Sequence, residues 1–321
     1  MSGATGIQVE HMTKSFGATR ALDGLDLVVA AGSVVAVLGP NGAGKSTLTR
    51  ILATLALADG GKASVAGFDV ATQPGEVRSR IGVTGQSTSL DEYLTGRQNL
   101  VMVGRLSRLA KRSAQARAAE LLDQFQLVDA ADRPTKTYSG GMLRKLDLAA
   151  SLVTRPEVLF LDEPTTGLDP RARLGMWDVI RDLGAEGTTI LLTTQYLDEA
   201  DQLAQQIAVV DHGRVIARGT SDELKARVGG EVLEVTLGDG SDARVASELL
   251  SQLAGGLAVV DPSLNRVSVP IGQSHGSITE VVRTLDRAGL VVDDIAIRRP
   301  GLDDVFMKLT GHAADAMGGT A

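Results

Sequence analysis

Three short and mostly apolar segments stand out in the first two thirds of the chain, at 33–38, 158–162 and 188–193. A run that stays apolar without alternating suits a strand that is buried on both faces, as in a parallel sheet. After the first segment, apolar residues recur with helical spacing at Leu48, Ile51, Leu52 and Leu55. We therefore predict an α/β fold in which a buried strand leads through a short loop into a helix.

Two other regions have different patterns. Residues 7–38 indicate short strands with turns at Gly17, Gly24 and Gly32, which predicts an antiparallel edge to the main sheet. Residues 87–137 are rich in Leu, Ala, Arg and Gln, and their apolar residues recur with helical spacing. We interpret them as a helical subdomain, with an inert helical insertion as the alternative.

The pattern restarts after Gly229–Gly230. Strand-like and helix-like segments then follow in the order β-α-β-β-α-β up to residue 298, which predicts a small α+β domain of ferredoxin-like topology. A last helical pattern at 302–309 can pack on this domain or on a partner. We therefore expect a domain at 1–228, a smaller domain at 229–312 and a loose tail at 313–321.

The loop after the first buried strand carries the strongest chemical signal. It fits the phosphate-binding pattern G-x-x-x-x-G-K-[S/T] between a strand and a helix. Its residues are Gly39, Pro40, Asn41, Gly42, Ala43, Gly44, Lys45, Ser46 and Thr47. Free backbone amides at the start of a helix favour an anion there. Lys45 can reach the β- and γ-phosphates of a nucleotide, and Ser46 can bind Mg²⁺.

Two further motifs can complete a nucleotide site. Asp162 ends the second apolar segment and can hold Mg²⁺ through water, and Glu163 can polarise an attacking water molecule. Ser139 precedes Gly140 and Gly141 at the start of a helical pattern, so it is a good N-cap for a second anion-binding helix end. Each motif by itself also fits a solvated turn or a plain capped helix.

Composition limits the remaining possibilities. The 321 residues include no cysteine, which excludes disulfides and cysteine-ligated zinc. The N-terminal residues do not have the pattern of a signal peptide, and no apolar run reaches the ~20 residues that span a bilayer. We therefore expect any membrane domain to belong to another polypeptide. A net charge of −7 argues against nucleic acid as the main partner.

The order of these motifs resembles the ATP-binding subunit of an ABC transporter over residues 7–228. Gln86 matches the glutamine loop of that family, and 138–142 resembles its signature LSGGQ, with departures at both ends. The two acids described above match the second acidic motif, and 167–170 matches the loop that follows it. Together with 193–195, where the family has its switch residue, six motifs follow the family order and make the resemblance highly specific.

Two positions need separate interpretation. Gln195 lies where the family normally has a switch histidine, and its amide can donate a hydrogen bond but does not titrate near neutral pH. We interpret it as a variant switch and not as the sign of a dead site. Phe16 lies where an aromatic residue usually stacks on adenine, and an apolar strand residue fits the position equally well.

The segments 138–142, 193–201 and 300–306 resemble the daunorubicin-resistance branch of antibiotic and lipid exporters. This resemblance implies an ATPase that binds ATP and Mg²⁺, with Gln86 also at the metal. It implies a head-to-tail dimer in which the phosphate loop of one copy faces Ser139–Gly141 of the other, with Asp169 at the interface. It further implies a membrane-spanning permease as partner and a peripheral location on the cytoplasmic face of the cell membrane.

Two other classes of function compete with an exporter subunit. A soluble ABC-type ATPase that serves ribosomes, DNA repair or chromosomes often carries tandem cassettes, long coiled coils or cysteine zinc sites, and none of these occurs here. A nucleotide-gated regulatory module without useful hydrolysis is suggested by Gln195, but Lys45, Asp162 and Glu163 are intact. An importer subunit is a further variant of the transport hypothesis, and the 302–309 segment favours the exporter branch.

Overall fold

The computed structural model describes residues 5–85, 89–228, 231–238, 241–271, 278–298 and 301–310. The chain divides into two compact units, one that ends at Ser221 and one that begins at Asp222. This division lies at the start of helix α8 (Ser221–Val228), ahead of the glycine pair at which the sequence pattern restarts. Helix α8 therefore belongs mainly to the second unit.

The first unit contains a six-stranded sheet in the order β10-β9-β3-β8-β7-β6. Its strands are β3 (Val34–Leu38), β6 (Ile81–Thr84), β7 (Val158–Asp162), β8 (Thr189–Thr194), β9 (Gln206–Asp211) and β10 (Arg214–Gly219). Neighbouring strands are parallel except β9 and β10, which are antiparallel. Every residue of β3, β7 and β8 is buried, which confirms the strands predicted from the apolar segments.

A second sheet of the first unit is antiparallel, with the order β2-β1-β4-β5. Its strands are β1 (Thr5–Phe16), β2 (Thr19–Ala30), β4 (Gly60–Val65) and β5 (Phe68–Asp69). The antiparallel strands predicted before residue 33 are present, but they form a sheet of their own with β4 and β5 and do not pair with the six-stranded sheet. The turn predicted at Gly24 is wrong. Strand β2 continues through Gly24, whose φ of 74° coincides with a shift of register opposite Met12 and Thr13. Glycine fits the left-handed backbone of a bulge as readily as that of a turn.

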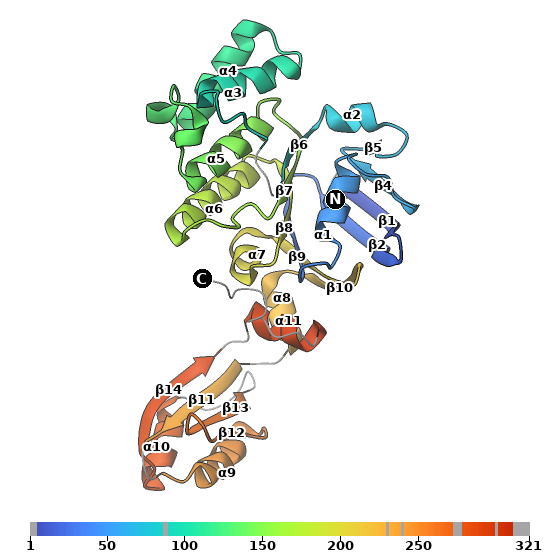
Figure 1. Ribbon diagram of the computed structural model, residues 1–321. Coiled ribbons are helices and arrows are strands. Elements are labelled where there is room, and N and C mark those ends of the chain that lie inside the picture. Colours follow the sequence, from blue (N-terminus) through green and yellow to red (C-terminus); the bar gives the residue numbers. More distant parts are fainter. Residues whose placement is uncertain are drawn as a thin grey trace. The chain divides into compact units, whose positions relative to one another are not determined.

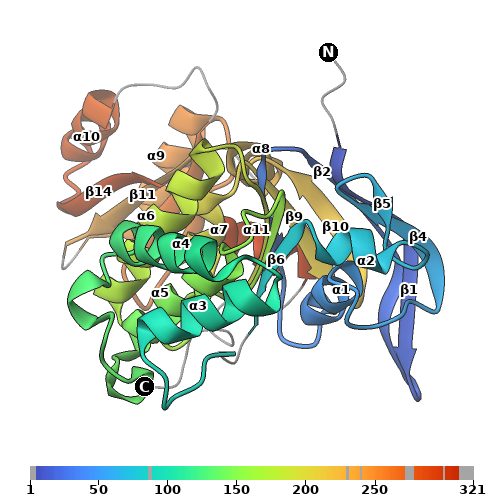
Figure 2. The ribbon, with the colours of Figure 1, turned by 90° about the horizontal axis from the view of Figure 1, so that it is seen from above.

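Helices cover the parallel sheet on both faces (Figures 1 and 2). Helix α1 contacts strands of both sheets, whereas α5 and α6 pack on each other on the opposite side, and α3 packs on α4 and α5. The helices of this unit are α1 (Lys45–Leu52), α2 (Pro74–Arg78), α3 (Gly96–Leu106), α4 (Lys111–Gln124), α5 (Gly140–Ser151), α6 (Pro170–Ala185) and α7 (Leu197–Leu203). Two short 3₁₀ turns, Val128–Ala130 and Thr135–Thr137, connect α4 to α5.

The second unit has the predicted order β-α-β-β-α-β. Its antiparallel sheet has the order β12-β13-β11-β14, so the first and third strands of the motif lie at the centre, as in a ferredoxin-like fold. The elements are β11 (Glu231–Leu237), α9 (Ala243–Ala254), β12 (Val259–Asp261), β13 (Arg266–Ile271), α10 (Ile278–Arg287), β14 (Val292–Arg298) and α11 (Leu302–Thr310).

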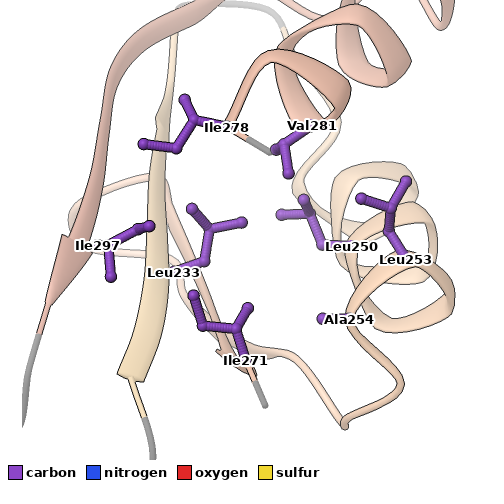
Figure 3. A pocket seen from close by; sticks show the side chains of 8 residues that line it. All are labelled: Leu233, Leu250, Leu253, Ala254, Ile271, Ile278, Val281 and Ile297. Atoms are coloured by element: carbon purple, nitrogen blue, oxygen red, sulfur yellow. The ribbon is translucent and has the colours of Figure 1, made fainter. Parts of the chain in front are cut away.

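The core of the second unit lies between its sheet and the helices α9 and α10. Alternate residues Leu233, Val235 and Leu237 of β11 are buried against it, as period-2 patterning requires. Figure 3 shows a small apolar cavity in this core, with Leu250 of α9 and Val281 of α10 on its wall. The cavity volume of about 10 Å³ is at the lower limit for one water molecule, so the space is a packing gap.

Helix α11 packs within the chain. Leu302, Val305 and Phe306 are buried, in agreement with the helical spacing of the 302–309 segment. Arg298 at the end of β14 lies 3.9 Å from Asp303 and 3.8 Å from Asp304 in the first turn of the helix. Acidic residues in a first helical turn also interact favourably with the helix dipole.

Candidate nucleotide-binding site

The loop 39–47 connects the end of β3 to the start of α1, as the sequence predicts. Gly44 has a φ of 103°, and a Cβ atom there would lie 2.3 Å from the carbonyl oxygen of Ala21. A Cβ atom at Gly39 would lie 2.2 Å from the carbonyl oxygen of Val210. Both positions therefore require glycine because neighbouring backbone leaves no room, and at Gly42 the φ of 84° has the same effect.

Lys45 places a positive charge inside this loop. Its side chain is only 4% exposed, and Nζ donates hydrogen bonds to the carbonyl oxygens of Gly39 at 2.7 Å and Pro40 at 3.0 Å. Burial lowers the pKa of Lys45 from its usual range, while Glu163 and Asp162 raise it in part. Lys45 is thus a buried cation that interacts electrostatically with Glu163 and Asp162.

Asp162 and Ser46 form a set of oxygen donors beside Lys45. The Ser46 hydroxyl donates to Oδ1 of Asp162 at 3.1 Å, and the Thr193 hydroxyl donates to the same oxygen. Strands β7 and β8 pair Asp162 with Thr193 directly, so the sheet register fixes this arrangement. Hydroxyl and carboxylate oxygens are ligands that Mg²⁺ prefers, and the convergence of Ser46 and Asp162 fits a Mg²⁺ ion bound to phosphate.

Glu163 follows directly and turns away from the strand. Its φ of 51° is left-handed, which costs a residue with a side chain roughly 1–2 kcal/mol. The Glu163 amide donates to the carbonyl oxygen of Thr193 at 3.0 Å, and the Thr166 hydroxyl donates to Oε2 of Glu163 at 3.3 Å. Neighbouring groups therefore hold both the backbone and the carboxylate of Glu163 in place, with 9% of the residue exposed.

Three site segments meet at one edge of the sheet. Strands β3, β7 and β8 are parallel neighbours, and Leu38 pairs with Thr194. Gly39, Asp162 and Gln195 therefore all lie at the carboxyl ends of adjacent strands, where open α/β sheets bind ligands. Gln195 is half-buried just after β8.

Of the two other residues predicted for the nucleotide site, the structure describes Phe16, whereas Gln86 lies outside the described residues. Phe16 is 55% exposed at the end of β1, with Nζ of Lys14 5.4 Å from the centre of its ring. It pairs with Thr19, and Ala21 of the same hairpin contacts the Gly44 backbone, so the hairpin borders the loop.

Ser139 and Asp169 are N-caps, as the sequence predicts for both. The Ser139 hydroxyl accepts a hydrogen bond from the Met142 amide at 3.3 Å, and Oδ1 of Asp169 accepts one from the Ala172 amide at 2.9 Å. Ser139, Gly140 and Asp169 are exposed. A Cβ atom at Gly140 would meet nothing within 4 Å, so the start of α5 is open to a ligand or partner.

The structure adds site residues that sequence reasoning missed. Thr193 was noted as part of a motif, but its bond to Asp162 depends on strand register. Gly213, in the turn between β9 and β10, donates its amide to the Ala43 carbonyl oxygen at 3.0 Å and so braces the phosphate loop. No local pattern signals either contact, since the partners are far apart in sequence.

Comparison with known proteins agrees with this geometry. A family profile described as "ABC transporter" matches residues 22–166. The daunorubicin resistance ATP-binding protein DrrA2 of Streptomyces coeruleorubidus is 54% identical over 309 residues, which cover 96% of each chain. The chain belongs to the ABC transporter family. The Nod factor export ATP-binding protein I of Sinorhizobium fredii is 40% identical, with 95% of this chain and 86% of that protein covered.

A solved ABC structure shows the same fold as the first unit. The structure of an ATP-binding subunit of an ABC transporter aligns with a TM-score of 0.62 at 28% identity, over 69% of this chain and 92% of the other. The chain is therefore an ATP-binding subunit of this family with ATPase activity. Among the described residues, no helix is both long and apolar enough to cross a membrane.

Proposed function

We propose that this chain is the motor subunit of an exporter, which hydrolyses ATP to drive a separate membrane-spanning permease. The observation that carries the proposal is the intact set of Lys45, Asp162 and Glu163 at one sheet edge. Support for export comes from relatives named for daunorubicin resistance and Nod factor export, which match nearly the whole chain. A regulatory module without hydrolysis would not need an ordered Glu163.

In this proposal each site residue has a specific role. The amides of loop 39–47 and Lys45 bind the β- and γ-phosphates, while Phe16 stacks on the adenine. Ser46, Asp162 and Gln86 hold Mg²⁺, which neutralises phosphate charge when bound. Glu163 accepts a hydrogen bond from the attacking water and polarises it.

The position of Gln195 supports a further role in hydrolysis. It follows β8 at the same sheet edge as Asp162, and its amide can donate a hydrogen bond to the γ-phosphate. Unlike histidine, glutamine stays neutral around pH 7, so it orients the phosphate without moving a proton. We assign it the position of the family switch residue and expect hydrolysis to proceed with it.

A head-to-tail dimer would complete the site. The chain has one phosphate loop and one Ser139–Gly141 motif, whose amides are exposed at the start of α5. In the dimer this helix end contacts the γ-phosphate bound to the other copy, and Asp169 lies at the interface. ATP then holds the two copies together and hydrolysis releases them.

The proposed cargo is an antibiotic, drug or lipid, and the proposed place of the chain is the cytoplasmic face of the cell membrane, bound to its permease. A net charge of −7 does not favour nucleic acid as a partner. The test is to express the chain with a candidate permease, chosen as a neighbouring gene product with several membrane spans, in a daunorubicin-sensitive host. We expect membrane association and increased drug tolerance, with tolerance lost in the Glu163→Gln variant.

The same experiment separates the alternatives. A chain that hydrolyses ATP but stays out of the membrane fraction would be a soluble ABC-type ATPase. A chain that binds ATP without hydrolysis would be a regulatory module. Membrane association without tolerance to any tested drug would rule out those drugs as cargo and leave the motor role supported.

A further inference from the structure

A buried glutamate lies behind the catalytic edge without touching it. Glu199, on α7, is 0% exposed. Its Oε1 accepts hydrogen bonds from the Thr165 hydroxyl at 2.7 Å and from the Trp177 indole Nε1 at 3.2 Å. A buried ionisable group is costly unless hydrogen-bonded, so its presence calls for an explanation beyond filling space.

The three partners come from three segments with separate tasks. Thr165 lies two residues after Glu163, and Glu199 lies four residues after Gln195. Trp177 is on α6, the helix that Asp169 caps. The Glu199 carboxyl group therefore connects the loop after Glu163, the segment after Gln195 and helix α6, which begins at the proposed dimer interface.

A second contact supports the same connection. The guanidinium of Arg173 lies 4.9 Å from the centre of the Tyr196 ring, a cation–π distance. Arg173 precedes Trp177 by one helical turn, so both side chains project from one face of α6. Tyr196 directly follows Gln195, so α6 holds the segment at both ends, at Tyr196 and at Glu199.

The electrostatic setting also favours a fixed network. Burial raises the pKa of Glu199, and the hydrogen bonds from Thr165 and Trp177 lower it in part. Oε1 of Glu199 accepts from two donors and so has few alternative arrangements, whereas Oε2 is buried without a hydrogen-bond partner among the described residues.

We propose that Glu199 is a positioning residue, which sets the backbone of Gln195 at a fixed place relative to Glu163 by hydrogen bonds to Thr165 and Trp177. It acts through these residues and does not contact the nucleotide. The proposal rests on the proposed roles of Gln195 and Glu163 in hydrolysis. It predicts that loss of the network lowers kcat, while ATP binding by loop 39–47 is retained.

The test uses Glu199→Ala, Glu199→Gln and Trp177→Phe in the full chain. We expect kcat to fall roughly 10- to 100-fold in Glu199→Ala, because a misplacement near 1 Å can cost about a hundredfold, while KM changes by less than about threefold. Glu199→Gln keeps the Oε1 acceptor and restores most of the rate. Trp177→Phe removes one donor together with part of the buried ring system and gives an intermediate loss.

A double-mutant cycle identifies the route of the effect. If Glu199 acts through Gln195, Trp177→Phe slows the unaltered chain but has almost no further effect in a Gln195→Ala background. Equal losses in both backgrounds would overturn the proposal. So would a Glu199→Ala variant that melts at a lower temperature but keeps the kcat of the folded fraction.

Two controls keep the outcomes distinct. Phe125→Leu alters a buried aromatic residue at the end of α4, in the helical region, and should lower stability without changing kcat. Gln195→Ala by itself tests the proposed function. If Gln195→Ala turns over ATP at the normal rate, the proposed switch role of Gln195 is wrong. If Gln195→Ala is impaired and the losses of Trp177→Phe and Gln195→Ala add, only the positioning role of Glu199 is wrong.

Discussion

The two units of the chain differ in whether they bury ionisable side chains. Among the described residues of the first unit, five with ionisable side chains are buried, namely Lys45, Asp147, Asp162, Glu163 and Glu199. In the described part of the second unit, every buried side chain is apolar, and the central core is formed by Leu, Val and Ala. The charged residues of its ion pairs, such as Arg298 and Asp304, are partly exposed.

This difference indicates that the first unit carries the catalytic residues, whereas the second unit has an ordinary apolar core. A buried charge lowers stability unless hydrogen bonds compensate, so its retention in the first unit indicates a task that apolar residues cannot perform. The second unit shows the ordinary solution of an apolar core under an amphipathic sheet and helices. Substitutions of the buried polar residues at the site of the first unit should therefore act mainly on turnover, and core substitutions in the second unit mainly on stability.

Lys45→Ala should have the largest effect on activity. Removing the cation leaves the phosphates without their main charge partner, and we expect ATP hydrolysis to fall by roughly a thousandfold with little loss of stability. Steady-state phosphate release and thermal melting provide the two measurements. Lys62→Ala, at an exposed lysine of β4, is the matched control. Normal hydrolysis by Lys45→Ala would refute the assignment of the site.

Ser139→Arg should come next. The added bulk at the exposed start of α5 would block contact with the second copy, so hydrolysis should fall by about a hundredfold. ATP binding by the monomer should stay within about twofold, because Ser139 serves the opposite site. Filter binding and phosphate release measure the two effects. Ser107→Arg, at the exposed end of α3, should change neither, and ATP-driven dimerisation of Ser139→Arg would contradict the account.

Leu250→Ala tests the expectation that core substitutions in the second unit lower stability and leave ATP binding unchanged. Leu250 is 2% exposed in the core of the second unit, and its truncation should cost that unit about 2–5 kcal/mol of unfolding free energy. ATP binding should not change, since the phosphate site lies wholly in the first unit. Leu257→Ala, at an 87% exposed leucine, is the control for denaturant unfolding. Loss of ATP binding in Leu250→Ala would break the separation of the two units.

Gln195→His should have the smallest effect. A histidine can strengthen the hydrogen bond to the γ-phosphate when protonated, so we expect turnover equal to or a few-fold above that of the unaltered chain. Measurement of kcat across neutral pH tests this, with the histidine variant gaining rate as pH falls toward 6.5, its usual pKa. Slower turnover at every pH would indicate a pocket shaped for glutamine.

Local sequence determines much of this molecule. The apolar segments predicted β3, β7 and β8, and the loop pattern predicted the turn that places Lys45, because strand burial and glycine conformation are local properties. The alternation after residue 230 predicted the order of the second unit correctly. Gly24 was misjudged, since a glycine within a strand marks either a turn or a bulge.

Other features depend on contacts between distant residues. The network of Thr165, Trp177 and Glu199 could not be predicted, because the first and last are 34 residues apart and a glutamate in a short polar helix usually faces solvent. The bond from Thr193 to Asp162 likewise requires the register of β7 and β8. The roles of Ser139 and Gln195 stay predictions, since they involve a second copy or a bound phosphate.

The central claim is that ATP, held in the site of one copy, joins two copies of the chain. The direct test is size-exclusion chromatography of Glu163→Gln with Mg²⁺ and ATP, because this variant should bind ATP without releasing phosphate. We predict a dimer with ATP, a monomer with ADP, and a monomer for the Lys45→Ala, Glu163→Gln double variant. A strictly monomeric Glu163→Gln variant with ATP bound would contradict the account.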